Sequence, residues 1–388
     1  MNFLKKLAVP LCLLAVCFGA GCKKTEEYKI FTNIPSGQYE VKNKNFNVQF
    51  IEGLNLQEEK HETEDVSGYT SMNWLRYMGV AEAELNVSDD FTKDGAKTKF
   101  DSLIVDINLL HGNIDRAVST AVANSDINAF NAAEPGETVE IGPVAYEIMS
   151  TAMDIYTFTE GYYNPALYYN VLAYGFGSAQ DYPHKVSELP KDDLISKYTD
   201  LASHFGEIVL SENEGKYFVT KPDCSVEVDG EAIAMKLDLN GISKGYMVDR
   251  IEKLFDKYGY NYGMFNYGFS SVLVRRHFRA GNYTLQLKDP RSHKIDSYIH
   301  IPASNKKLST SGDYVQYYTI DGVRYCHIID PTTGKPVRKG IMTATVIGGS
   351  AAEDDALTTA IMCMGKDKAI EFIKEKLTDR MVVFTYGA

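Results

Sequence analysis

A carboxylate and a hydroxyl stand four residues apart near the end of this 388-residue chain. Asp355 and Thr359 follow the small residues 349–352, in a stretch that predicts a loop running into a helix. Side chains four residues apart share one face of a helix, so the two groups would point together. Paired hard oxygen ligands suit Mg²⁺ better than Zn²⁺, which prefers Cys and His. The alternative is that the acidic residues here only complement the helix dipole.

A second stretch has the features of an anion site. Residues 238–249 predict a strand, a turn bracketed by Gly241 and Gly245, and the start of a helix. Such a turn would bring backbone N–H groups and the ammonium of Lys244 to one point, which suits a phosphate. The spacing matches neither a Walker loop nor a dinucleotide fingerprint, so an ordinary strand-to-helix turn is the competing interpretation.

Hydroxyls and a histidine form a third group. Residues 309–314 gather hydroxyls around a glycine, and His327 ends a predicted strand just before a turn rich in Pro and Gly. The hydroxyls either bind a polar ligand or satisfy their own backbone. An imidazole titrates near neutrality, so His327 could donate to a phosphate or move a proton, although a lone histidine at a strand end is often structural.

Helices and strands in irregular order must position these groups. Apolar residues recur at helical spacing in residues 100–118, 144–156 and 244–258. Strands are predicted at 217–220, 225–228, 235–239, 271–275 and 283–287. Helices mixed with strands, without a regular alternation, predict an α+β body rather than a doubly wound sheet.

Charge and cysteine usage exclude some classes of protein. The formal net charge is -12, from 40 Lys and Arg against 52 Asp and Glu, without a dense basic patch. This balance does not favour a nucleic-acid binder. Beyond Cys22 the cysteines are Cys224, Cys326 and Cys363, at irregular spacing. They predict neither a disulfide framework nor a zinc site.

The N-terminus predicts export. Two lysines precede an apolar run at residues 7–18 that is too short to span a bilayer, and small residues lead to Cys22. This pattern resembles the bacterial lipobox, so residues 1–21 are predicted to be a lipoprotein signal and Cys22 the lipidated residue; a plain secretory signal is the alternative. Residues 22–72 are predicted to be a polar tether and extension, with a possible strand at 48–54, and residues 73–388 the folded body. We therefore expect an exported protein, lipid-anchored to the extracytoplasmic face of a bacterial cell membrane.

Seven segments in order carry a family resemblance. They are residues 125–131, 159–165 leading to 174–177, 238–249, 288–291, 309–314, 327–336 and 353–360. Over about residues 78 to 388 the chain resembles the ApbE family of bacterial FAD:protein FMN transferases, whose α+β body is related to the T-fold. The resemblance implies an enzyme that uses Mg²⁺ and takes FAD as substrate. It would move FMN to a Ser or Thr hydroxyl in the flavinylation motif of an exported flavoprotein, and release AMP.

The same resemblance assigns roles to individual residues. The side chains of Asp355 and Thr359 and the backbone carbonyl of Ser243 would be the metal ligands. Lys244 would approach the pyrophosphate, and His327 and Asp313 are the candidate bases for the acceptor hydroxyl. The expected FAD contacts are Asn131, Thr159, Glu160, Tyr162, Asn240, Lys244, Ser309, Ser311, Gly312 and His327.

Some positions depart from the family pattern. The family commonly reads Thr-Asp-Gly-x-Phe-Asp-Pro where this chain has Glu160 and Asn164, and it has a Gly-Gly pair where this chain has Gly268 and Phe269. These changes fall on the expected FAD side of the site. They leave two alternatives open: a Mg²⁺-dependent FAD pyrophosphatase that releases FMN and AMP, and a non-catalytic FAD-binding lipoprotein. Retention of the metal pair favours chemistry over binding alone.

Overall fold

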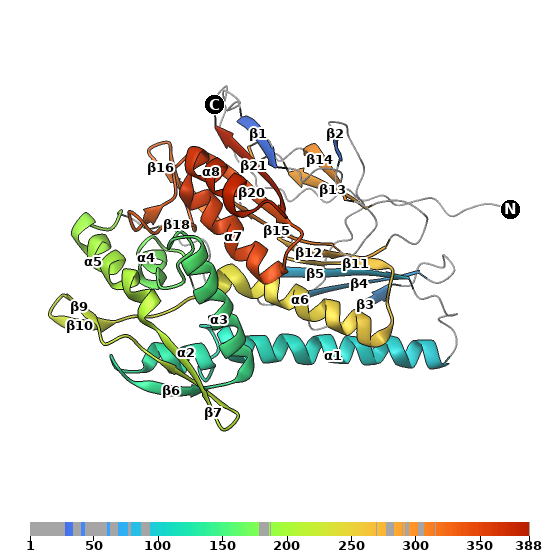
Figure 1. Ribbon diagram of the computed structural model, residues 1–388, viewed down its shortest axis with the longest axis horizontal. Helices are drawn as coiled ribbons and strands as arrows, with labels where there is room; N and C mark the ends of the chain where they lie inside the picture. The colour runs from blue at the N-terminus through green and yellow to red at the C-terminus, as the bar shows by residue number, and fades with distance from the viewer. Residues whose placement is uncertain are drawn as a thin grey trace.

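Figure 1 shows the computed structural model of the chain. The structure describes residues 28–33, 40–42, 60–62, 69–76, 79–86, 94–177, 186, 188–268, 270–276, 283–288, 290–291, 295–301, 306–314 and 316–387. The predicted signal, Cys22 and the possible strand at 48–54 lie outside these residues. Within the described part of the chain, no helix is long and apolar enough to cross a membrane.

A nine-stranded sheet forms the centre of the body, and every neighbouring pair of its strands is antiparallel. The strand β1, which falls within the predicted tether, forms one edge by pairing with β21. The strands of the nine-stranded sheet, in spatial order, are β1 (Tyr28–Asn33), β21 (Met381–Gly387), β20 (Ile341–Ile347), β15 (Lys306–Gly312), β12 (Ser271–Val274), β11 (Gly263–Tyr267), β5 (Gly79–Asn86), β4 (Tyr69–Arg76) and β3 (Lys60–Glu62).

Two helices pack against this sheet at its centre. They are α6 (Asn240–Tyr258) and α7 (Ala351–Met364), and both contact β12 and β15. In Figure 1, α6 lies between α7 and the long helix α1 (Asp94–Val118). The buried faces of these helices are apolar, so the core lies between them and the sheet.

The chain between α1 and α6 builds a mixed region at the N-terminal end of α6, drawn in green in Figure 1. A three-stranded antiparallel sheet, a hairpin and several short helices make up this region. Its elements are α2 (Asp126–Ala132), β6 (Thr138–Ile141), α3 (Pro143–Phe158), α4 (Tyr168–Ala173), α5 (Asp192–Ser203), the 3₁₀ turn η1 (His204–Glu207), β7 (Val209–Asn213), β8 (Lys216–Thr220), β9 (Ser225–Val228) and β10 (Glu231–Ala234).

Smaller elements complete the body. A three-stranded sheet, two short hairpins and one more helix lie around the main sheet. They are β2 (Glu40–Lys42), β13 (Tyr283–Lys288), β14 (Ile295–Ile301), β16 (Tyr317–Ile320), β17 (Val323–Cys326), β18 (Ile329–Asp330), β19 (Lys335–Pro336) and α8 (Lys366–Lys376).

The predicted α+β class is confirmed, and the three helices predicted from periodicity are present as α1, α3 and α6. One predicted strand is wrong: residues 235–239 form no strand and belong to no sheet. Their backbone is held instead by a side chain, because Leu237 exchanges hydrogen bonds with the carboxamide of Asn131. Residues 309–312, noted in the sequence as hydroxyls gathered around a glycine, are the end of the central strand β15.

The crossing of α6 and α7 depends on Gly245. A Cβ at this position would overlap the carbonyl oxygen of Ala351 and lie 2.7 Å from Cα of Ala352. Four residues further along α6, Asp249 caps the start of α7. It accepts hydrogen bonds from the Ser350 hydroxyl at 2.6 Å and from the N–H groups of Ala351 and Ala352 at 2.9 and 3.0 Å. A carboxylate at a helix N-terminus is stabilising, so a single turn of α6 fixes where α7 begins.

We expect Gly245→Ala to lower the free energy of unfolding by about 1–3 kcal/mol, because a methyl group at this position must push the two helices apart. Urea denaturation measures the change. Gly112→Ala is the matched control, since a Cβ on Gly112 of α1 meets nothing within 4 Å. That variant should gain up to about 1 kcal/mol from helix propensity. Equal effects of the two substitutions would contradict the close approach of α6 and α7.

Candidate active site

The predicted carboxylate and hydroxyl face the first turns of α6. The N–H of Gly245 donates to Oδ2 of Asp355 at 3.1 Å. A Cβ built on Gly241 would lie 3.9 Å from Oγ1 of Thr359. The structure therefore places Asp355 and Thr359 on the face of α7 that meets the glycine-bracketed turn of α6.

Asp355 is a desolvated carboxylate. It is 3% exposed, and burial raises its pKa to about 6, although the nearby charge of Lys244 and the bond from Gly245 act in the opposite direction. No ion pair holds this carboxylate among the residues that the structure describes. Its neighbour Asp354 is also buried, but Arg380 donates to it at 2.8 Å. Of these two adjacent carboxylates, only Asp354 forms an ion pair with a side chain among the described residues.

Asp238, just before α6, holds the first residue of that helix through a hydrogen bond. This residue accepts the N–H of Asn240 at 2.8 Å and donates its own N–H to the carbonyl of Pro165 at 3.0 Å. Ser243 is buried in the next turn, and Lys244 is half-buried beside it. The charge of Lys244 lowers the pKa of Asp238, against a larger rise from burial, as it does for Asp355. Lys244 is therefore close enough to both carboxylates for its charge to act on them, whereas Asn240 and Ser243 line a separate cavity beside this turn.

Ser309 and Ser311, two residues apart on β15, both face α7. Ser311 lies 2.8 Å from Oγ1 of Thr358 and 3.4 Å from Oγ1 of Thr359, so it belongs to the site, and Gly312 follows it at the strand end. Ser309 is fully buried and bonds to Ser271 at 2.9 Å and to the carbonyl of Ala351 at 3.2 Å. Ser309 therefore joins the sheet to the start of α7, and Ser311 contacts the same helix further along, at Thr358 and Thr359.

The two candidate bases differ in their surroundings. Arg291 donates two hydrogen bonds to the carboxylate of Asp313, at 2.7 and 2.9 Å, and Nη1 of Arg324 lies 3.4 Å from the same carboxylate. His327 is partly buried, and desolvation together with the charge of Lys244 lowers its pKa to about 4. His327 is thus neutral at physiological pH, and it is close enough to Lys244 for that charge to lower its pKa. Asp313, in contrast, is paired with two arginines.

Two expected FAD contacts are engaged inside the protein. The carboxamide of Asn131 donates to the carbonyl of Leu237 at 3.1 Å and accepts its N–H at 2.7 Å. The hydroxyl of Thr159 donates to the carbonyl of Ile155 at 2.7 Å and accepts the N–H of Tyr163 at 3.1 Å. Both side chains therefore shape the backbone next to the site through hydrogen bonds within the protein.

Two other expected contacts turn toward α8. Glu160 is exposed and pairs with Lys368 at 3.1 Å and Lys376 at 3.0 Å, and hydrogen bonds from these lysines lower its pKa. The ring of Tyr162 lies under Lys339 and Lys368, at 5.4 and 4.7 Å from the ring centroid. The structure does not bring Glu160 and Tyr162 to the Asp355 side chain.

Sequence reasoning missed a cavity on the opposite side of the first turn of α6. At its wall, Nε2 of His111 and the hydroxyl of Tyr267 are 2.6 Å apart. The Asp115 carboxylate is 3.2 Å from Nδ1 of His111, an ion-pair distance without hydrogen-bond alignment. No sequence pattern relates these residues, which come together only in the fold. The lining residues are His111, Ile114, Asp115, Val118, Ser119, Asn240, Ser243, Met247 and Tyr267.

The residues around Asp355 fit a magnesium ion. A buried carboxylate that lacks a cationic partner is costly, and a bound cation would offset that cost. The hydroxyl of Thr359, on the same face of α7, is a hard oxygen donor of the kind that Mg²⁺ prefers. The described residues hold no cluster of three His, Cys, Asp or Glu side chains that suits a metal.

A family comparison decides the assignment of the chain. The model of the ApbE family matches residues 82–384, which is most of the body and includes every element of the site. The chain belongs to the ApbE family. The sequence resemblance and the predicted fold class are therefore confirmed.

Individual relatives agree with this assignment. The FAD:protein FMN transferase of Buchnera aphidicola is 26% identical over 265 residues, covering 68% of this chain and 74% of the relative. The enzyme of the same name from Escherichia coli K12 is 25% identical, covering 68% and 71%.

Solved structures of the ApbE family share the fold. The flavin transferase ApbE of Vibrio cholerae superimposes with a TM-score of 0.63 at 21% identity, over 85% of this chain and 97% of that protein. The ApbE protein of Thermotoga maritima gives a TM-score of 0.64 at 24% identity, over 81% and 93%.

We expect Asp355→Asn to stabilise the metal-free protein at neutral pH. Because the pKa is raised from 3.8 to about 6 on folding, the folded state favours the protonated acid, and ionisation costs up to about 3 kcal/mol above pH 6. The cost is absent below about pH 4, where the carboxyl is protonated in both states, grows between about pH 4 and 6, and is constant above that range. Thermal unfolding in chelator across this range measures it.

Asp249→Asn is the control, because an amide cannot accept all three hydrogen bonds that Asp249 receives. It should destabilise the protein at neutral pH. A wild-type protein that is as stable as Asp355→Asn at neutral pH, without metal, would contradict the desolvated state of Asp355.

Proposed function

We propose that this protein is a Mg²⁺-dependent FAD:protein FMN transferase that moves FMN from FAD to a Ser or Thr hydroxyl of a target flavoprotein and releases AMP. The observation that carries the proposal is the meeting of Asp355 and Thr359 with the first turns of α6, in a body of the ApbE family. The names of its relatives support the flavin transfer. The metal, the acceptor hydroxyl and the AMP product go beyond those names and are what the resemblance to the ApbE family implies.

Binding of the pyrophosphate falls to the start of α6 in this proposal. The N-terminus of a helix attracts anions, and Lys244 adds a full positive charge there. Asp355, Thr359 and the carbonyl of Ser243 would hold Mg²⁺. When bound, the ion would neutralise the negative charge that develops on the phosphoryl oxygens as the bond to AMP breaks.

The acceptor hydroxyl must lose a proton as it attacks phosphorus. His327 is the better candidate, since it is neutral at physiological pH, and Asp313 is held by two arginines. Nδ1 of His327 lies 3.4 Å from the carbonyl of Gln316. If Nδ1 carries the hydrogen and donates there, Nε2 keeps the lone pair that accepts the proton.

Export and anchoring through Cys22 complete the proposal. The acceptor would then be an exported flavoprotein that carries a Ser or Thr flavinylation motif, met at the extracytoplasmic face of the membrane. A signal followed by small residues and Cys22 supports this location.

Thr359→Val should reduce FMN transfer and raise the Mg²⁺ concentration needed for half-maximal rate, because valine keeps the shape and loses the oxygen. The expected loss is roughly 10- to 100-fold, as for an interaction of about 1.5–3 kcal/mol. Thr359→Ser keeps the hydroxyl and should retain most of the activity. The assay follows flavin fluorescence on a denatured acceptor together with AMP release, with FAD and varied Mg²⁺.

The outcomes separate the alternatives. Mg²⁺-dependent fluorescence that stays on the acceptor supports the transferase. If several acceptors are tried and AMP is released without any labelled acceptor, the protein would be an FAD pyrophosphatase rather than a transferase. Tight FAD binding without AMP would mean a binding protein, and equal activity of the valine and serine variants would remove Thr359 from the metal site.

A further inference from the structure

Tyr163 carries a buried hydroxyl without a partner. The residue is 3% exposed, and among the described residues its Oη has no hydrogen-bond partner. Buried tyrosine hydroxyls usually find one, and leaving a donor unpaired costs about 1–3 kcal/mol. An unpaired donor beside a candidate active site is expected to find its hydrogen-bond partner in a bound ligand.

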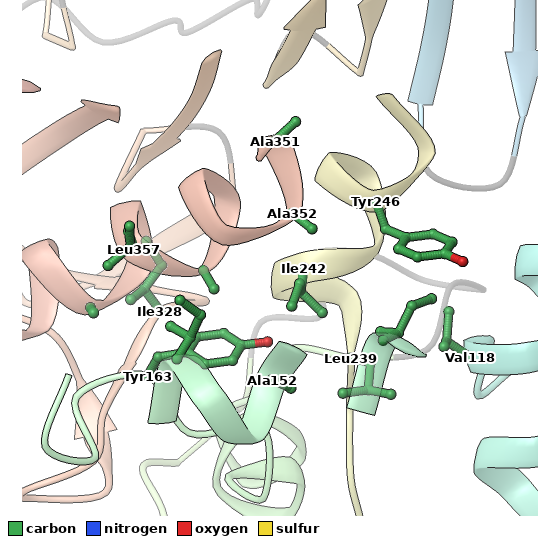
Figure 2. Packing of buried hydrophobic residues seen from close by; sticks show 14 of the residues in the cluster. Val118, Ala152, Tyr163, Leu239, Ile242, Tyr246, Ile328, Ala351, Ala352 and Leu357 are labelled. Carbon is green, nitrogen blue, oxygen red and sulfur yellow. The ribbon is translucent and has the colours of Figure 1, made fainter. Parts of the chain in front are cut away.

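The hydroxyl points toward the first turn of α6. A Cβ built on Gly241 would lie 3.4 Å from Cε2 of Tyr163 and 3.9 Å from its Oη, and the same point is 3.9 Å from Oγ1 of Thr359. Figure 2 shows the ring of Tyr163 with its oxygen on the side of Ile242, the next residue of that turn. Oη of Tyr163 and the hydroxyl of Thr359 therefore approach the same glycine.

The preceding loop fixes this direction. Glu160 and Gly161 both have positive φ, at 56° and 83°, so the chain reverses sharply after α3. The N–H of Gly161 bonds to the carbonyl of Tyr156 at 2.8 Å, and the N–H of Tyr163 bonds to the hydroxyl of Thr159 at 3.1 Å. A rigid aromatic side chain on a pinned backbone holds its hydroxyl in place without further ordering on binding.

The charges around Tyr163 keep it a donor. Burial, followed by the charges of Asp355 and Asp238, raises its pKa well above the ordinary value. The phenol is therefore neutral at physiological pH and has a hydrogen to give. The start of α6 and Lys244 attract an anion to the same place.

We propose that Tyr163 is a site residue whose hydroxyl donates a hydrogen bond to a phosphate oxygen of a pyrophosphate-containing ligand held between the first turn of α6 and the Asp355–Thr359 face of α7. The inference rests on the proposed function for the identity of the natural ligand, FAD. The ligand class follows from the site, because a phosphate oxygen is an acceptor that a neutral phenol and a helix N-terminus can share. As charge builds on the phosphoryl oxygens, this bond would strengthen, so Tyr163 would support both binding and turnover.

The test replaces the hydroxyl alone. Tyr163→Phe keeps the ring, and without ligand its unfolding midpoint should equal or exceed that of the parent, because an unpaired buried hydroxyl is removed. Its affinity for pyrophosphate in the presence of Mg²⁺, measured by calorimetry, should fall roughly 10- to 100-fold, as for a hydrogen bond to a charged group. Its response to Mg²⁺ alone should be unchanged, and FAD should follow pyrophosphate.

Tyr258→Phe is the matched control. Its hydroxyl bonds to Asp106 at 2.8 Å at the other end of α6, about 27 Å along the helix axis from Asn240. That variant should bind pyrophosphate and FAD as the parent does.

Several results would overturn the proposal. They are pyrophosphate affinity in Tyr163→Phe equal to that of the parent, an equal loss of affinity for Mg²⁺ alone, a lower unfolding midpoint without ligand, or no Mg²⁺-dependent pyrophosphate binding by the parent. If the parent binds pyrophosphate through Tyr163 yet transfers no FMN, the proposed function falls and the anion site stands.

Discussion

The site depends on the backbone contact between α6 and α7. Because Gly245 has no side chain, α7 comes close enough for the Gly245 N–H to donate to the carboxylate of Asp355. Asp249 accepts hydrogen bonds from the first N–H groups of α7. A helix whose start is bonded to a carboxylate on its neighbour cannot slide along it without losing those bonds. The position of the Asp355–Thr359 face relative to the first turn of α6 is therefore set by backbone chemistry, and the surrounding apolar core keeps it there.

The neighbouring carboxylates Asp354 and Asp355 of α7 differ in the groups that partner them. Both are buried, and burial raises the pKa of both, to about 7 and about 6. Arg380 donates to Asp354 and offsets part of the effect of burial, while Asp355 has the N–H of Gly245 and the charge of Lys244. A fold that leaves a desolvated carboxylate without an ion pair accepts a cost in stability, and that cost is recovered when a cation binds.

The local part of this structure was predictable from the sequence. Periodicity identified α1, α3 and α6, and the spacing of Asp355 and Thr359 predicted their shared face. What failed depends on contacts distant in sequence. Residues 235–239 have the composition of a strand, but Asn131, more than a hundred positions away, satisfies their backbone. Tyr162 and Tyr163 are neighbours of the same type, and only the turn at Glu160 decides that one ring faces α8 and the other faces α6.

The charges around the site suggest why a metal and an anion would bind together. Asp355 and Asp238 alone would repel a pyrophosphate, and Lys244, the α6 N-terminus and the hydroxyl of Tyr163 would disfavour a lone cation. A magnesium–pyrophosphate pair would satisfy both sets of groups at once, because the cation would meet the carboxylate and hydroxyl of α7 while the anion would meet the start of α6 and the hydroxyl of Tyr163. Each ion would then lower the cost of desolvating the other, so their binding free energies would be coupled and neither affinity would be a fixed property of the apo site.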